Sequence, residues 1–571
     1  MFFENHGKIL KKNLNLNMQN TPGGKYDTGC IFLHLRLCYT AYHSKQERDE
    51  QMLSKIITYG ILGIKSFRID VETNISRGIP EFDVVGQGDV SIKEARVRVR
   101  TAINNSGYKF PDGRIAVNLA PAGLRKEGAF LDLPMAIGIL AAGGEVRCSC
   151  IDKCAIIGEL SLNGSVRSSA GVLVRLTQAA KEGAVHALVP CENANEAFNV
   201  KELNIFPVEN LKDAVRILNS LTLESRGMNS GYLDKWGNIE KNNEKVELQN
   251  DEVLDFSDVK GQYHAKRAME IAACGGHNII MVGAAGCGKT MLGKRFSSIL
   301  PPLSDKEAYE VTGVYSLARM LPAGYGLMKT RPLRLISPGI TRTALIGGGR
   351  PLIPGEISLA HKGVLFMDEM TEYDSSLIQL LRRPLEQKNM LISRLGYTQN
   401  LPTDFIFIGA ANPCRCGKLF EGTCKCTPLQ IKSTISRISK PILDRVDIHI
   451  PMKRVPFKDM DSDNYNETSD IVRSRVIKVR EFQKERYKKS DTQTNSSMTI
   501  RDREKYCILN RNGKNLLQKA TEVMGLSARA YDKVLKIART IADMEFNDSI
   551  NEDHIAEAIS YRTIDNMIDE K

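Results

Sequence analysis

The segment at residues 283–290, Gly-Ala-Ala-Gly-Cys-Gly-Lys-Thr, carries the most informative chemistry of this chain. It fits the pattern G-x-x-x-x-G-K-[ST] and follows an apolar run at residues 278–282, which predicts a buried strand. In such a strand–loop–helix setting the glycines let backbone N–H groups surround a polyphosphate, Lys289 reaches its β- and γ-phosphates, and Thr290 ligates Mg²⁺. The glycines concerned are Gly283, Gly286 and Gly288. The sequence therefore predicts a nucleoside triphosphate site.

Two carboxylates end a second apolar run, at residues 363–367. Asp368 at the strand tip is suited to holding Mg²⁺, and Glu369 to orienting and deprotonating the attacking water. A third apolar run, residues 404–411, leads to Asn412, whose amide could orient the same water or sense the γ-phosphate. Each strand alone is a common pattern, but their order after a phosphate loop predicts ATP hydrolysis.

Four thiols are close together in the sequence, in two C-x-C pairs separated by seven residues. They are Cys414, Cys416, Cys424 and Cys426. Thiolates at this density suit tetrahedral Zn²⁺, and Gly417 and Gly422 between them permit a tight turn. Because C-x-C pairs are less usual than C-x-x-C pairs, a zinc site and a metal-free cluster of reduced thiols both stay open.

The composition is that of a globular protein with several domains. At 571 residues the chain is too long for one core, and 42% hydrophobic with 26% charged residues is ordinary for globular domains. No apolar run reaches the roughly 18–20 residues that cross a bilayer, so we expect no membrane association. Thirteen cysteines without a secretory signal favour reduced thiols and a cytoplasmic location. The net charge of +12 is weak support for a polyanionic partner.

The elements that position these residues divide the chain into five parts. In order, they are an extension (1–51), an α/β domain (52–228), a polar linker (229–255), the nucleotide-binding core (256–455) and a helical region (456–571). We interpret the extension as disordered or as preceding the true start at Met52, where a regular strand pattern begins. In the α/β domain we expect strands at 67–73, 82–85, 114–119 and 154–160, and helices at 91–105, 132–142, 172–182 and 211–220.

The order of motifs resembles the magnesium-chelatase-like branch of the AAA+ ATPases and, within it, the ComM/YifB family. The resemblance covers residues 52–562 and rests on specific motifs. These are Val-Asn-Leu-Ala-Pro-Ala (117–122), Leu-Arg-Lys-Glu-Gly (124–128), Asp-Leu-Pro (132–134), Gly-Glu-Leu-Ser (158–161), Pro-Gly-Glu-Ile-Ser-Leu-Ala-His (354–361), Asn-Pro-Cys (412–414), Leu-Asp-Arg (443–445) and Gly-Leu-Ser-Ala-Arg (525–529). The resemblance implies an α/β fold class with a Lon-protease-like N-terminal domain, a three-layer α/β/α P-loop core with a magnesium-chelatase-type insertion, and a C-terminal helical lid.

The resemblance also implies a function. It predicts an ATP- and Mg²⁺-dependent ring, a homo-hexamer, that remodels single-stranded or branched DNA without sequence preference, as a branch-migration helicase in natural transformation or recombination. Arg445 resembles the finger that reaches a neighbour's γ-phosphate, and Arg529 resembles the second sensor. The alternative is a magnesium-chelatase-like or chaperone-type ATPase that remodels a protein partner.

One segment departs from the family pattern. The family usually has a Pro-His-His run before the second acidic strand, whereas residues 336–346 here contain no histidine. The segment is expected to face the pore of the ring, so the departure bears on substrate contact and leaves ATP chemistry intact. Its surroundings are basic, with Arg331, Arg334, Arg342 and Arg350. These arginines could neutralise DNA phosphates or simply solvate a loop.

The residues argue against proteolysis despite the Lon-like resemblance. A Ser–Lys dyad needs a serine in the loop after Lys-Glu-Gly and a lysine on a following helix. The loop here continues from Gly128 through Ala129 to Phe130, and the helix offers Arg175, which stays protonated. We therefore predict that the chain is not an active protease.

Overall fold

The computed structural model describes most of the chain from Leu53 to Arg562. The described residues are 53–62, 65–86, 90–123, 126, 128–225, 254–321, 325–349, 352–394, 397–456, 466–488, 490 and 492–562. The predicted extension (1–51) and nearly all of the predicted linker (229–255) lie outside them, and the five domain boundaries stay predictions. Within the described ranges, no helix has both the length and the apolar character that a bilayer span requires.

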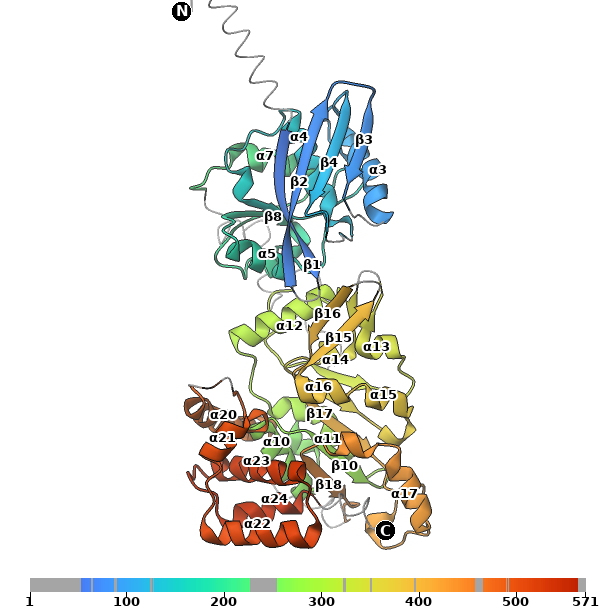
Figure 1. The fold of residues 1–571 in the computed structure, drawn as a ribbon, viewed down its shortest axis with the longest axis vertical. Helices are drawn as coiled ribbons and strands as arrows, with labels where there is room; N and C mark the ends of the chain where they lie inside the picture. The colour runs from blue at the N-terminus through green and yellow to red at the C-terminus, as the bar shows by residue number, and fades with distance from the viewer. Residues whose placement is uncertain are drawn as a thin grey trace, which may run out of the picture.

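The N-terminal part is built on a seven-stranded sheet, drawn at the top of Figure 1, in the order β3-β4-β2-β1-β5-β8-β9. Its strands are β1 (Leu53–Leu62), β2 (Lys65–Ser76), β3 (Glu81–Val85), β4 (Arg114–Ala120), β5 (Cys154–Ile156), β8 (His186–Pro190) and β9 (Asn204–Val208). In β2, burial alternates through Ile69, Val71 and Ile75, as expected for a strand with one face on a core. The strands β1, β5, β8 and β9 are parallel, and β2 is antiparallel to both its neighbours.

Helices cover both faces of this sheet. They are α3 (Val90–Asn105), α4 (Asp132–Ala142), α5 (Val172–Lys181), α6 (Ala194–Ala197) and α7 (Leu211–Ser220). The predicted helices at 132–142 and 211–220 agree with the observed bounds of α4 and α7. The predicted strand at 154–160 is instead β5 and the short β6 (Glu159–Leu160), which pairs with β7 (Val166–Arg167), because Gly158 leaves the sheet and donates to the Phe130 carbonyl at 3.3 Å. The Lon-like assignment of this part stays a prediction.

A second sheet, entirely parallel, forms the core of the nucleotide-binding part, in the order β11-β14-β17-β10-β18. Its strands are β10 (Ile279–Gly283), β11 (Leu333–Ile336), β14 (Val364–Met367), β17 (Ile406–Ala411) and β18 (Ile448–Met452). Every residue of β10 is buried, which is the pattern of a strand covered on both faces. Ile279 belongs to the core on one face and Ile280 to the core on the other. A mixed α/β fold with a parallel sheet of this kind fits an AAA+-like architecture.

Helices and short hairpins surround this sheet. The helices are α10 (Tyr263–Gly275), α11 (Lys289–Arg295), α12 (Asp305–Leu317), α13 (Arg342–Ile346), α14 (Glu356–Leu359), α15 (Ser375–Gln379), α16 (Arg382–Gln387), α17 (Pro428–Ser436) and α18 (Lys440–Leu443). The hairpins are β12 (Gly347–Gly348) with β13 (Ile353–Pro354), and β15 (Asn389–Arg394) with β16 (Tyr397–Pro402).

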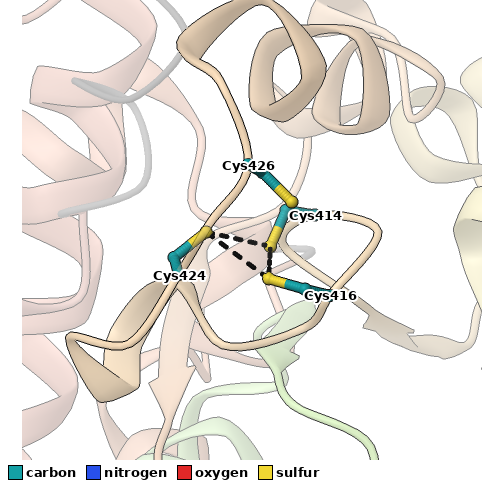
Figure 2. A group of neighbouring side chains, drawn as sticks. All are labelled: Cys414, Cys416, Cys424 and Cys426. Atoms are coloured by element: carbon teal, nitrogen blue, oxygen red, sulfur yellow. Dashed lines mark hydrogen bonds between the residues drawn. The ribbon is translucent and has the colours of Figure 1, made fainter.

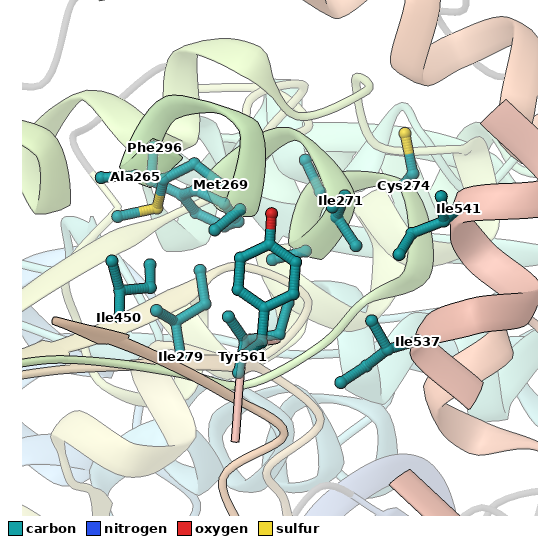
Figure 3. Close-up of a cluster of buried hydrophobic side chains, with 14 of the residues drawn as sticks. Ala265, Met269, Ile271, Cys274, Ile279, Phe296, Ile450, Ile537, Ile541 and Tyr561 are labelled. Carbon is teal, nitrogen blue, oxygen red and sulfur yellow. The ribbon is translucent and has the colours of Figure 1, made fainter. Parts of the chain in front are cut away.

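C-terminal helices pack beside α10, at the lower left of Figure 1. They are α20 (Ser469–Arg486), α21 (Ile500–Tyr506), α22 (Arg511–Met524), α23 (Ala528–Met544) and α24 (Glu552–Ser560). Figure 3 shows the shared core, in which Tyr561 lies among Ile279 and Ile450 of the sheet and Ile537 of α23. These helices therefore share one hydrophobic core with the nucleotide-binding sheet. Their identification as a lid stays a prediction.

The two sheets are joined through α12. Its Ser316 hydroxyl donates to the Glu196 carboxylate and accepts from the Gly171 N–H at 2.8 Å. The Tyr309 hydroxyl of the same helix donates to the carbonyl of Asn199. Side chains of α12 thus reach the N-terminal part at the loop before α5 and at α6.

Candidate active site

The phosphate loop connects β10 to α11 as the sequence predicts, since the strand ends at Gly283 and the helix begins at Lys289. Gly286 and Gly288 have left-handed backbones, with φ of 77° and 93°. A Cβ built at either position meets no atom within 4 Å, so the loop has open space where a side chain would stand. Backbone N–H groups around such a concave turn, at the N-terminus of a helix, suit a phosphate.

Lys289 connects this loop to β17. Its buried Nζ donates to the carbonyls of Gly283 and Ala284, each at 2.8 Å, and to Asn412 Oδ1 at 3.1 Å. Burial lowers the pKa of Lys289, while the nearby charges of Asp368 and Glu369 act in the opposite direction. The predicted residues Lys289 and Asn412 are thus in direct contact.

The predicted Mg²⁺ ligands are also adjacent. The Thr290 hydroxyl donates to Asp368 Oδ2 at 2.6 Å, where the carboxyl end of β14 comes next to α11. A hydroxyl and a carboxylate side by side are oxygen donors of the kind Mg²⁺ prefers, so these residues fit the ion. Glu369 follows with a left-handed φ of 49°, its N–H donates to Asp368 Oδ1 at 2.9 Å, and it is exposed.

Arg445 and Arg529 lie at the opposite edge of the sheet. Arg445 precedes β18, which runs parallel to β10, so it stands at the amino ends of the strands, away from the phosphate loop. It donates to Glu386 and, at 2.5 Å, to the Pro441 carbonyl, while its buried Nε has no hydrogen-bond partner among the described residues. Arg529, at the start of α23, lies 3.8 Å from the same Glu386 carboxylate. Both arginines line a cavity of about 480 Å³. The structure therefore brings the two arginines together but does not bring them to the phosphate loop of their own chain.

Two residues of these sites have no sequence motif that points to them. Glu386, on α16, pairs with both arginines. Gln262 donates from Nε2 to the Cys287 carbonyl in the phosphate loop at 2.9 Å and to the Lys453 carbonyl beyond β18 at 2.7 Å. The only local signal for Gln262 is the Gly-Gln pair immediately before α10.

The four cysteines converge as a cluster (Figure 2). Their four sulfurs all lie within 4.8 Å of one another, and three of the separations are 3.4, 3.5 and 3.7 Å. Sulfurs at the corners of a tetrahedron around Zn²⁺, with bonds of about 2.3 Å, lie about 3.8 Å apart. The four thiols therefore fit a Zn²⁺ ion.

The arginines around the predicted pore segment are in different environments. Arg331 pairs with Glu307 at 2.9 Å and Arg334 with Glu356 at 2.6 Å, and both guanidinium groups are largely buried. Arg342 is exposed at the first residue of α13, and Arg350 lies outside the described residues. Of the three described arginines, only Arg342 is exposed, whereas Arg331 and Arg334 are paired with carboxylates, and contact of this segment with DNA stays a prediction.

Two residues near the positions where the Lon-like resemblance predicts a Ser–Lys dyad, Phe130 and Arg175, contact each other. The Arg175 guanidinium lies over the Phe130 ring, 3.7 Å from its centroid, and its Nε donates to the Ala170 carbonyl at 3.3 Å. Burial lowers the pKa of Arg175 to about 9, which leaves it protonated at neutral pH. This contact is one of packing and hydrogen bonding.

Comparison with known proteins identifies the family. The model for magnesium chelatase, subunit ChlI, matches residues 255–460, that for subunit ChlI of Mg-chelatase residues 71–193, and that for the ChlI C-terminal region residues 466–562. The chain is 38% identical over 513 residues to competence protein ComM of Haemophilus influenzae, covering 90% of this chain and 98% of that protein. It is 36% identical over 517 residues to protein YifB of Salmonella typhimurium, with the same coverage. A shorter match, 27% over 165 residues, covers 28% of this chain and 24% of the magnesium-chelatase 67 kDa subunit of Chlorobaculum parvum.

The fold, the phosphate loop and these matches together define an AAA+-type ATPase of the magnesium-chelatase-like class. Within that class, the chain belongs to the ComM/YifB family. The family implies ATP and Mg²⁺, and AAA+ proteins are usually oligomeric.

Proposed function

We propose that the chain binds and hydrolyses ATP at the carboxyl edge of its parallel sheet. One observation carries the proposal: Lys289 contacts both the phosphate loop and Asn412, while Thr290 contacts Asp368. Three strand ends therefore meet around one site. Thr290 and Asp368 would hold Mg²⁺, which would supply positive charge to the phosphate oxygens.

The protein's own residues divide the remaining tasks. Lys289 exchanges its loop carbonyls for phosphate oxygens, with its charge favoured by the two nearby carboxylates. Asn412 orients Lys289 or the attacking water. Glu369, exposed at the strand tip, accepts the proton of that water.

We further propose that the active unit is a ring, a homo-hexamer, in which the amino edge of one subunit meets the phosphate loop of the next. Arg445 and Arg529 share a cavity on the edge away from their own loop, and the Arg445 Nε has no partner among the described residues. Both groups would reach the γ-phosphate held by a neighbour, Arg445 as the finger and Arg529 as the second sensor.

The substrate we propose is DNA, single-stranded or branched, with the ring acting as a branch-migration helicase. The resemblance to the ComM/YifB family supports this, together with the exposed Arg342 at the start of α13. Arginines repeated around a ring neutralise successive phosphates without reading base sequence.

Equilibrium titration with a labelled DNA fork, in the presence of a non-hydrolysable ATP analogue and at two salt concentrations, tests the proposal. We expect binding that weakens steeply with salt, because released counterions favour the complex. Arg342→Glu should lower affinity for unrelated sequences by about tenfold and leave basal ATPase intact. Arg511→Glu is the matched control, since Arg511 is likewise exposed at the first residue of a helix. Absence of binding by assembled rings at low salt would contradict the proposal.

The alternative is an ATPase that remodels a protein partner, as in a magnesium-chelatase-like or chaperone-type machine. The contacts of Ser316 and Tyr309 with the N-terminal part favour it, because they connect the ATPase to a second domain that a protein partner could bind. ATP turnover that does not rise with forked DNA would favour this alternative. We also propose that the N-terminal part is not an active protease, which is supported by the absence of a hydroxyl side chain from residues 128–132 and by the packing of Arg175 against Phe130.

We also propose that the cysteine cluster holds one Zn²⁺. The sulfur separations of 3.4–3.7 Å support this, as do four thiols converging from one short segment. Metal analysis of the purified chain should find about one zinc per subunit.

A further inference from the structure

The thiol knuckle, residues 414–426, begins where the nucleotide site ends. Asn412 accepts a hydrogen bond from Lys289 at 3.1 Å, and Cys414 is only two residues further along the chain. A change in the conformation of the knuckle is therefore expected to move the Asn412 amide, which contacts Lys289 of the phosphate loop.

The knuckle also touches the phosphate loop itself. Gly417 is buried, has a left-handed φ of 72°, and closes a turn by donating to the Cys414 carbonyl at 3.0 Å. A Cβ built on Gly417 would lie 3.4 Å from Ala284 Cα and 3.7 Å from the Ala285 nitrogen. The backbone of the knuckle thus lies against the first residues of the phosphate loop.

The opposite end of the phosphate loop is held by a different side chain, Gln262. Gln262 ties the Cys287 carbonyl to the Lys453 carbonyl, and the next residue, Arg454, pairs with Glu421 of the knuckle at 3.0 Å. The knuckle therefore meets the phosphate loop in two ways. Its backbone at Gly417 lies against Ala284, and its Glu421 pairs with Arg454, the residue after the Lys453 that Gln262 links to the loop.

The knuckle has little apolar material to hold it in this position. Within residues 414–427 only Cys414 and Gly417 are buried, and Phe420 packs partly against the neighbouring core. In a loop of this kind a bound metal can take the place of a hydrophobic core. The four thiols are the group in it that can supply that metal site.

We propose that the metal-closed knuckle is a brace that sets the conformation of the phosphate loop and of Asn412, so that zinc occupancy controls nucleotide affinity. The inference rests on the ATP site and the zinc site proposed above. It assigns the metal a role at the nucleotide site, whereas a merely structural zinc would affect only the stability of the knuckle.

The first test compares zinc-loaded and chelator-stripped full-length chain in titrations with a fluorescent ADP analogue. Stripping should weaken binding by about tenfold, and restoring zinc should reverse the loss. The double variant Cys416→Ser/Cys424→Ser should behave like the stripped chain, while Cys148→Ser/Cys191→Ser, two half-buried thiols of the N-terminal part, should behave like wild type. Thermal unfolding checks that each variant is folded.

A second pair of variants tests the contact between the knuckle and the phosphate loop without removing the metal ligands. Gly417→Asn adds a side chain against the phosphate loop, and asparagine tolerates the left-handed backbone. We expect zinc content to be unchanged and nucleotide affinity to fall several-fold. Gly422→Asn is the matched control, because Gly422 has a φ of 73° in the same knuckle but nothing within 4 Å of a built Cβ.

The outcomes of these experiments test the brace separately from the ATP site and the zinc site on which it rests. Equal nucleotide affinity with and without zinc, or equal behaviour of Gly417→Asn and Gly422→Asn, would overturn the brace and leave the ATPase proposal standing. A purified chain without zinc would overturn the zinc site and the brace together. Failure of the zinc-loaded chain to bind nucleotide would overturn the ATPase proposal and the brace with it.

Discussion

The two edges of the parallel sheet differ in how much of a binding site a single chain forms there. At the carboxyl edge, Lys289 contacts Asn412 and Thr290 contacts Asp368, and a Cβ built on Gly286 or Gly288 would meet no atom within 4 Å. At the amino edge, charged side chains line a cavity of about 480 Å³, and a single carboxylate, Glu386, serves two arginines.

This difference suggests where a second subunit is required. The buried Nε of Arg445 has no hydrogen-bond partner within the described part of the chain, and an unpaired buried donor is unfavourable unless a ligand satisfies it. The carboxyl edge has the groups that we propose bind a triphosphate, whereas at the amino edge Arg445 and Arg529 share the Glu386 carboxylate beside a cavity. We infer that the amino edge is completed by the nucleotide of a neighbour.

The largest expected effects come from breaking the carboxyl edge. Glu369→Gln should keep ATP binding and abolish steady-state turnover, because the amide can still contact water but cannot take its proton. Lys289→Ala should weaken ATP binding itself. Binding titrations and ATPase assays separate the two outcomes.

The controls for these variants lie close by. Glu372→Gln and Lys294→Ala change exposed residues of the same types in the same segments and should be silent. Substantial turnover by Glu369→Gln would remove that residue from the mechanism.

Removing Arg445 from the amino edge should stop hydrolysis at the phosphate loop of the neighbouring subunit. Arg445→Ala should reduce ATPase by about 10³-fold, the usual effect of losing such a finger. An equal mixture of inactive Arg445→Ala and inactive Lys289→Ala subunits should recover activity at about a quarter of the interfaces, where both residues are intact. Turnover per subunit that is independent of protein concentration, or no recovery in the mixture, would contradict action between subunits.

The sequence predicts the carboxyl edge well because its signals are local. The glycine pattern and the apolar run before it determine a strand that ends at Gly283 and a helix that begins at Lys289, and parallel strands carry Asp368 and Asn412 to the same edge. The C-x-C pairs are similarly local, and their sulfurs converge as the spacing suggests.

The rest depends on contacts between distant segments, which spacing cannot reveal. Glu386 meets Arg445 across 59 positions, and Gln262 meets Lys453 across 191. The environment of the arginines in the basic segment depends on such distant contacts too. The sequence alone does not show that the charge of Arg334 is paired, whereas in the fold Arg334 forms a salt bridge with Glu356.

The smallest expected effect tests whether Glu386 restrains the amino edge. Its carboxylate pairs with Arg445 and lies 3.8 Å from Arg529 in the single subunit, and under our proposal the neighbour's nucleotide would displace it. Glu386→Gln should weaken that competition by up to about 1 kcal/mol, because Glu386 is partly exposed to solvent. We therefore expect half-maximal ATPase at a protein concentration a few-fold lower than for wild type, with unchanged ATP binding by isolated subunits. Concentration series of wild type, Glu386→Gln and the control Glu372→Gln measure this directly. A higher concentration requirement would mean that Glu386 instead positions the two arginines for the neighbour.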